Sequence, residues 1–165
     1  HKNIGFVGTR LMTPSIDDRF FGYLKALMER GIKYRADWII DDRDNIYGKM
    51  NYDRQFILPK EVPTAFFCNC DKAASLIIRK LEEAGYSVPG DVSVVGFDNF
   101  EYDQEADIGI TTYEINIGEM AKRAVHIMLH KMQNALYSAG VFSIQGKIIE
   151  RESVKKIGKS VPYAK

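Results

Sequence analysis

Short runs of apolar, often β-branched residues alternate along this chain with segments in which apolar residues recur every three or four positions. The runs predict strands and cover residues 3–8, 37–41, 63–69 and 92–97. The periodic segments predict helices and cover residues 15–30, 50–58 and 71–84. Strands that alternate with helices are typical of a doubly wound parallel sheet, so we expect an α/β fold with three layers.

Residue types at two helix starts support these boundaries. Ser15 precedes Asp17 and Asp18, and acidic residues interact favourably with the dipole at the start of a helix. Asp71 stands directly before the next periodic segment. Ser and Asp side chains accept hydrogen bonds from unpaired helical N–H groups, so we predict Ser15 and Asp71 as N-caps.

The pattern changes after the fourth predicted strand. A polar, acidic loop, a short strand, a long helix, a last strand and a polar, basic tail follow, at residues 98–109, 111–113, 117–134, 146–152 and 154–165. The apolar positions of the long helix spread wider than a single core stripe. We therefore expect this helix to bury against more than one neighbour.

Composition narrows the class of protein. Hydrophobic residues make up 45% and charged residues 27% of the 165 residues, which is enough for one domain with its own core. The net charge is +1, so no strong bulk field attracts this piece to nucleic acid. We expect no transmembrane helix, because no apolar run reaches about 18 residues. No signal-peptide pattern opens this piece.

The two cysteines, Cys68 and Cys70, are expected to be reduced thiols. They stand two positions apart on a predicted strand, so both point to one face, and neighbours at this spacing rarely form an unstrained disulfide. Reduced thiols are usual in cytosolic proteins, which favours a cytoplasmic location.

Two charged residues stand out as candidates for binding. Asp98 directly follows the strand at 92–97, and ligands of open parallel sheets bind beyond the carboxyl ends of the strands. Arg19 falls in the first turn of the first predicted helix, where the dipole disfavours a cation. The alternatives are a turn-forming acid for Asp98 and a surface ion pair of Arg19 with Asp17, Asp18 or Asp98.

Five motifs carry a resemblance to a known family. Residues 15–22, 62–71, 88–99, 110–112 and 148–153 resemble its SxxxRxxG, PTAxFxxND, VPxDISVVGFDD, LTT and LVxRxST motifs, in that order. From about residue 3 to 153 the chain is similar to the effector-binding core of bacterial transcriptional regulators of the lactose/galactose repressor (LacI/GalR) family.

The resemblance implies a periplasmic-binding-protein-like fold in which two α/β subdomains close on a sugar or glycoside. Residues 1–153 would be the second subdomain, and 154–165 its polar tail. The helix-turn-helix and the first subdomain would be absent from this chain. Residues 114–145 normally cross to pack on that first subdomain, so in this chain we expect exposed apolar surface there, or a non-native contact that covers it.

The resemblance also implies partners. Family members usually form homodimers, and we expect the symmetric contact along the helix at 72–84 and the loop near Tyr102. Operator DNA would be bound only by the full-length protein, because this piece shows no recognition-helix motif and no basic stripe. We expect no membrane partner.

Site residues follow from the motifs. In the family, the arginine and the aspartate that match Arg19 and Asp98 contact the sugar. Asp71 matches the acid of the "ND" turn, where an N-cap role competes with a ligand role. Cys70 replaces the asparagine of that turn, and a thiol is a poor substitute for a carboxamide. Ile115 stands where many members have glutamine, so the two changes together suggest a more apolar pocket.

A fifth ligand-binding candidate, Arg43, falls roughly where some members carry an aromatic residue that stacks on the sugar. Trp38 and Tyr47 are rival candidates for that position, and for each a core role competes with a ligand role. The predicted ligand-binding residues are therefore Asp98, Arg19, Asp71, Cys70 and Arg43.

Two other classes of protein compete with this reading. A secreted sugar-binding protein of a transport system shares the fold and remains the alternative. An enzyme is disfavoured, because the first turn, Gly5 to Thr9, lacks the G-x-G-x-x-G spacing of a phosphate-binding loop and no catalytic triad is suggested. His126 and His130 supply half a metal site without a third ligand, which favours a solvated helix face. We expect no cofactor and no metal.

Overall fold

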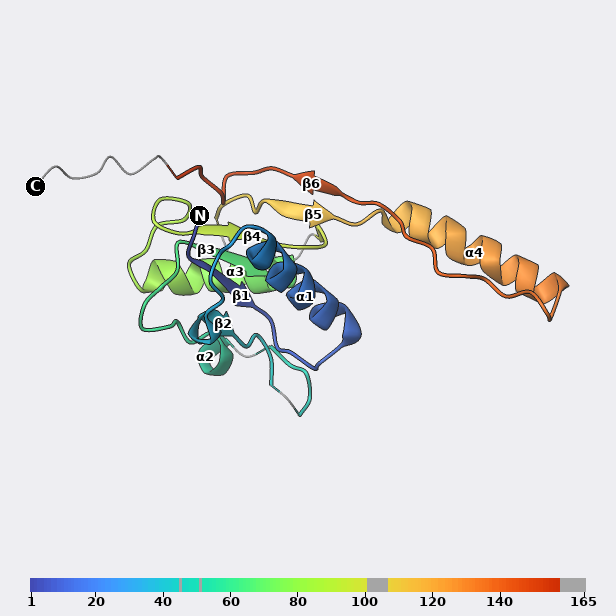
Figure 1. Cartoon of the computed structure of the whole chain (residues 1–165), viewed down its shortest axis with the longest axis horizontal. Coiled ribbons are helices and arrows are strands. Elements are labelled where there is room, and N and C mark those ends of the chain that lie inside the picture. Colours follow the sequence, from blue (N-terminus) through green and yellow to red (C-terminus); the bar gives the residue numbers. More distant parts are fainter. Residues whose placement is uncertain (45, 51, 101–106, 158–165) are drawn as a thin grey trace, which may run out of the picture.

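A parallel sheet forms the centre of the fold. The computed structural model describes residues 1–44, 46–50, 52–100 and 107–157. Four parallel strands pair in the order β2-β1-β3-β4 (Figure 1). Their bounds are β1 Ile4–Val7, β2 Ile39–Ile40, β3 Ala65–Cys68 and β4 Ser93–Val95. The predicted α/β fold with a parallel sheet is confirmed.

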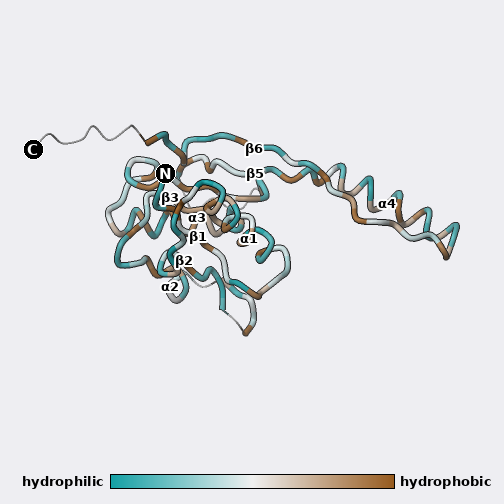
Figure 2. Tube along the Cα trace, in the orientation of Figure 1, coloured by the Kyte–Doolittle hydropathy of each residue, from teal (hydrophilic) through white to brown (hydrophobic). Residues whose placement is uncertain are grey.

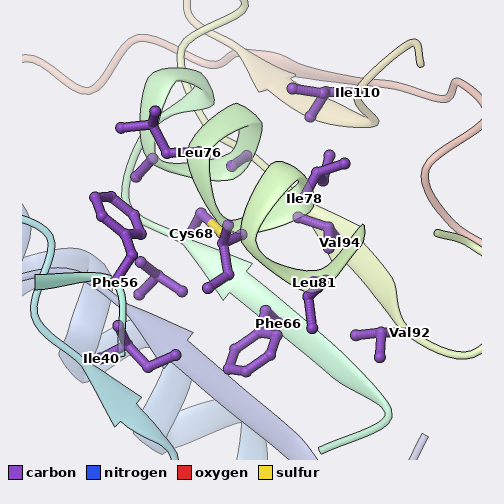
Figure 3. Close-up of a cluster of buried hydrophobic side chains, with 14 residues drawn as sticks. Ile40, Phe56, Phe66, Cys68, Leu76, Ile78, Leu81, Val92, Val94 and Ile110 are labelled. Atoms are coloured by element: carbon purple, nitrogen blue, oxygen red, sulfur yellow. The ribbon is translucent and has the colours of Figure 1, made fainter. Parts of the chain in front are cut away.

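Side chains of the strands alternate between two hydrophobic clusters on opposite faces of the sheet. Phe6 packs with Phe20 and Tyr23 of α1 (Pro14–Glu29). Its neighbour Val7 belongs to the other cluster, which α3 (Asp71–Glu83) dominates. Figure 3 shows side chains of α3 above those of the strands. Helices therefore pack on both faces, and the expected three layers are present.

Both predicted N-caps are wrong. The N-cap of α1 is Thr13, whose hydroxyl accepts a hydrogen bond from Ile16 N at 3.3 Å. Pro14 is the first helical residue, a position that suits proline because its missing N–H would have no helical partner. The N-cap of α3 is Cys70, with no side-chain capping bond, and Asp71 is the first residue inside the helix.

Regular structure around β2 is shorter than the sequence predicted. Residues Ala36–Trp38 form a 3₁₀ helix before the strand begins, and the indole Nε1 of Trp38 donates to Glu61 O at 2.9 Å. The helix predicted at 50–58 is reduced to α2, Tyr52–Gln55. Phe56, directly after α2, is fully buried in the cluster under α3.

A second, antiparallel pair of strands, β5 (Thr112–Glu114) and β6 (Lys147–Ile149), continues the fold beyond β4. Isolated parallel bridges join Val95 to Thr111 and Asp98 to Glu114. Ser153 forms two hydrogen bonds with Val94 of β4. Val94 N donates to Ser153 O at 2.8 Å, and the Ser153 hydroxyl donates to Val94 O at 2.6 Å.

The last helix, α4 (Ile117–Gln133), projects away from the sheet (Figure 1) and buries none of its residues. Its apolar side chains stay exposed, Met128 at 65% and Met132 at 79%. Figure 2 shows hydrophobic positions along α4, outside the globular part. The expectation of exposed apolar surface is confirmed. Packing of residues 114–145 on another subdomain stays a prediction. Across the described ranges, no helix has the length and apolarity to cross a membrane.

Candidate functional site

Four of the five predicted ligand-binding residues gather at the carboxyl edge, meaning the edge of the sheet where β1 to β4 end. Arg19 extends from α1, Arg43 follows β2, Cys70 follows β3 and Asp98 follows β4. Burial lowers the pKa of Arg19, the charge of Asp98 raises it, and the charge of Arg43 lowers it further. These groups are therefore close enough to act on one another electrostatically.

Arg19 is held by an aromatic ring. Its guanidinium carbon lies 4.1 Å from the centroid of the Phe97 ring, within the range of a cation–π contact. Because α1 begins at Pro14, Arg19 lies in the second turn and not in the first, as the sequence had suggested. The unfavourable helix dipole is thus a poor explanation for this residue. The ring of Phe97 and the charge of Asp98 explain its placement better.

Asp98 adopts a backbone conformation that is rare outside glycine, with φ of 97°, and Asn99 follows with φ of 51°. One carboxylate oxygen accepts a hydrogen bond from Phe100 N at 3.2 Å, so the turn-forming role considered from the sequence is present. Burial raises the pKa of Asp98, while the Phe100 N–H and the charge of Arg19 lower it. The carboxylate therefore combines a structural turn with a place beside Arg19.

Asp71 lies behind Asp98, with 7% of its surface exposed. Burial raises the pKa of Asp71 to about 6, and the charge of Asp98 raises it too, whereas a hydrogen bond from Thr112 lowers it. Its Oδ1 has no hydrogen-bond partner. A Cβ on Gly96 would approach this oxygen to 1.9 Å, so only glycine fits there without a shift. A ligand contact by Asp71 stays a prediction.

Cys70 contributes a neutral, partly buried thiol. Burial raises the pKa of Cys70 to about 11, so the group is protonated at pH 7. Burial raises the pKa of the fully buried Cys68 as well. Both thiols are free, which confirms the interpretation as reduced cysteines.

Arg43 is anchored by a residue that the sequence reasoning missed, Asp42. The Asp42 carboxylate is fully buried and accepts from Arg43 Nε at 3.1 Å and from Nη2 at 2.8 Å. It also accepts from Thr9 N at 2.9 Å and from Asn69 Nδ2 at 3.1 Å. The available signal was an acid directly after an apolar strand, the same feature that singled out Asp98.

The rival aromatic candidates separate clearly. Trp38 is a core residue, 4% exposed, whereas Tyr47 is 78% exposed in a loop. On α4, the Nε2 atoms of His126 and His130 lie 3.0 Å apart. Within the part of the chain that is described, no three potential ligands gather as a metal site. Tyr102, expected near a dimer contact, lies outside the described residues.

Hollows of the surface lie beside the candidate site, and Arg19 and Phe97 line one of them. One extends from Phe67 and Phe97 over Val95 to Ile148 and Arg151. The other shares Phe67 and Phe97 and runs along α1. Arg43 lines a further hollow together with Asp41 and Asp44.

Comparison with known proteins identifies relatives over nearly the whole chain. The family model described as "Periplasmic binding protein-like domain" matches residues 1–154. The transcriptional repressor PurR of Photobacterium profundum is 30% identical over 157 residues, which are 95% of this chain and 47% of the relative. The operon regulator NtdR of Bacillus subtilis (strain 168) is 32% identical over 154 residues, 93% of this chain and 47% of NtdR. The chain thus spans about half the length of the curated relatives it matches.

Solved structures share the fold. A LacI transcriptional regulator from Bacillus cereus subsp. cytotoxis NVH 391-98 superposes with a TM-score of 0.78 at 24% identity, covering 96% of this chain and 56% of that one. The complex of the transcriptional regulator CelR with cellobiose gives 0.77 at 20% identity, covering 93% of this chain and 47% of that one. At these identities the likeness shows the fold alone.

Proposed function

The chain belongs to the family of periplasmic-binding-protein-like domains, as an effector-binding domain of the LacI/GalR type, and on this premise we propose that it is the ligand-sensing part of a bacterial transcriptional regulator. It would form the second half of an effector domain and act with an N-terminal helix-turn-helix outside this sequence. We place the regulator in the cytoplasm, where its operator lies. Its activity is binding, with no turnover of the ligand.

The observation that carries this proposal is the meeting of two guanidinium–carboxylate sets at the carboxyl edge. Arg19 lies beside Asp98, and Arg43 is paired with Asp42. The two guanidinium groups offer donors and the Asp98 carboxylate offers acceptors, and a sugar hydroxyl is both donor and acceptor. The Phe97 ring adds an apolar surface beside Arg19. We therefore propose a sugar or glycoside as effector.

The relatives support the regulator more than the transport receptor, because PurR and NtdR are both named as regulators. Their description as regulators does not specify the ligand of this chain, so we infer the ligand class from the site. The solved CelR complex holds cellobiose, which is a fact about that protein. It makes cellobiose a rational first member of a test panel.

The regulatory mechanism we propose is coupling between two sites. Effector binding would close the two subdomains, shift the protomers of a homodimer and change the fit of their DNA-binding heads to operator half-sites. We expect the dimer contact along α3, whose outer face carries the exposed Lys72 and Arg79.

The test is Asp98→Asn in the full-length protein, with isothermal titration against a panel of cellobiose and common mono- and disaccharides. Loss of a charged hydrogen-bond acceptor costs about 1.5–3 kcal/mol, so we expect about a 10- to 100-fold weaker affinity for the sugar that the wild type binds. Asp107→Asn, at an exposed position away from the cluster, should leave the affinity unchanged. Unchanged binding by Asp98→Asn, or hydrolysis of the sugar, would contradict the proposal.

A further inference from the structure

Asp42 combines complete burial with a full negative charge, which is costly unless partners compensate it. Its partners come from three different strand ends. Thr9 follows β1, Arg43 follows β2 and Asn69 follows β3, and each donates at least one hydrogen bond to the carboxylate. Although burial raises the pKa of Asp42, the hydrogen bonds and charge of Arg43 and the Thr9 N–H hold it below its usual range. The group is therefore a carboxylate at neutral pH.

The geometry of the Asp42–Arg43 contact fixes the plane of the guanidinium. Nε and Nη2 of Arg43 each donate to a different oxygen of Asp42, at 3.1 and 2.8 Å. Two parallel bonds between rigid forks leave little rotational freedom. The Arg43 side chain is 20% exposed while Asp42 is fully buried, so the cation reaches the surface from a buried anchor.

The main chain of Arg43 is held as well. Its N–H donates to the Thr9 hydroxyl at 3.0 Å, and this hydroxyl donates to Arg43 O at 3.0 Å. Asp42 N also donates to the same hydroxyl, at 3.0 Å. Thr9 is 2% exposed, so the loops after β1 and β2 are joined below the surface. Backbone and side chain of Arg43 are thus constrained from two directions.

We propose that Asp42 is a positioning residue: it fixes the Arg43 guanidinium at the carboxyl edge of the sheet, beside Arg19, before any effector arrives. That the fixed guanidinium serves effector binding rests on the function proposed above. A guanidinium that is already ordered loses little side-chain entropy on binding, which would otherwise cost about 0.5–1.5 kcal/mol for such a side chain. Asp42 itself would not touch the effector.

The chain contains a matched comparison. Arg35 forms a similar two-point contact with Asp37, with Nε donating to Oδ1 at 3.0 Å, but that pair lies on the surface and the Asp37 side chain is 55% exposed. Arg35 also pairs with Glu61 at 2.7 Å and lies over the Trp38 ring, so it has more partners than Asp37 alone, but both of its carboxylates are exposed whereas Asp42 is buried. If burial is what orders Arg43, the two side chains must differ in mobility.

The experiment is ¹⁵N NMR of the arginine Nε–H groups in the 165-residue chain, with exchange against solvent measured for each. We expect the Nε–H of Arg43 to exchange at least about tenfold more slowly than that of Arg35, because exchange requires local opening of the buried contact. Asp42→Asn should remove this protection and leave Arg35 unchanged. Asp37→Asn, the matched control, should affect Arg35 alone.

Equal exchange of Arg43 and Arg35 in the wild type would overturn the proposal, and so would an unchanged Arg43 signal in Asp42→Asn. If Asp42→Asn fails to fold, the comparison of the two arginines in the wild type still decides. The measurement needs no effector. A failure of the sugar-sensing function would instead appear in the Asp98→Asn titration, so the two failures can be told apart.

Discussion

Two carboxyl groups, Asp71 and Asp98, lie close enough at the candidate site to act on one another electrostatically. Asp71 is nearly buried, with one oxygen unpartnered, and the charge of Asp98 acts on it. Burial raises the pKa of both groups, to about 6 for Asp71 from its usual 3.8. Because the folded chain holds a proton on Asp71 at a pH where the unfolded chain releases it, this residue links folding to pH.

The raised pKa of Asp71 makes the free energy of unfolding depend on pH. Between about pH 4 and pH 6 the folded state binds more protons at Asp71 than the unfolded state, so the free energy of unfolding falls as the pH rises through this window. A shift of about two pKa units corresponds to at most about 3 kcal/mol. We expect Asp71→Asn to lack this contribution. The difference between wild type and variant, measured by urea unfolding at pH 4, 5, 6 and 7, should therefore shift with pH. A constant difference would contradict the assignment.

Among the elements, one buried hydroxyl joins three segments at the edge beyond β4. Ser153 is fully buried, donates to Val94 O at 2.6 Å and accepts from Thr111 N at 2.8 Å. It thereby joins β4, the start of β5 and the segment after β6. These three segments lie far apart in the sequence, so the contact closes a long loop that contains α4.

Ser153→Ala should weaken this edge. The substitution leaves the Thr111 N–H and the Val94 carbonyl without their side-chain partner, and an unsatisfied buried group costs about 1–3 kcal/mol. We expect a loss of that size in the free energy of unfolding and faster exchange of the Thr111 amide proton. Ser143→Ala, at an exposed position between α4 and β6, serves as control and should change neither. Equal behaviour of the two variants would show that the hydroxyl does not stabilise the edge.

The order of elements and the gathering of Arg19, Cys70, Arg43 and Asp98 could be predicted from the sequence. Alternation of apolar runs and periodic segments indicates a parallel sheet, and residues after parallel strands must meet at one edge. The ends of the helices were less accessible, as Thr13 and Pro14 show. The role of Asp42 could not be predicted, because its partners Thr9 and Asn69 are 33 and 27 positions away and only the folded register brings them together.

Across the described molecule, apolar surface remains uncovered in two places, beside the sheet and along α4. Parallel sheets normally have both faces covered. Here Phe67, Phe97 and Ile148 line an open hollow, and α4 buries none of its residues. The chain spans 47% of the length of its PurR relative. We propose that further residues of a longer protein cover this apolar surface.

The same substitution, made in the 165-residue chain and in the full-length protein, tests whether α4 packs on a first subdomain. Met128 lies in the apolar stripe of α4 and is 65% exposed, so in the 165-residue chain Met128→Ala should change the free energy of unfolding by no more than about 0.5 kcal/mol. In the full-length protein we expect the same substitution to cost about 2–5 kcal/mol, because the stripe would pack on the first subdomain. Val94→Ala is the control, since Val94 is fully buried in the sheet and should cost roughly the same in both lengths. Urea unfolding of both proteins gives all four values.

A neutral Met128→Ala in the full-length protein would mean that α4 does not cross to the first subdomain. A large cost in the 165-residue chain would mean that another surface, such as a second copy, already covers the stripe.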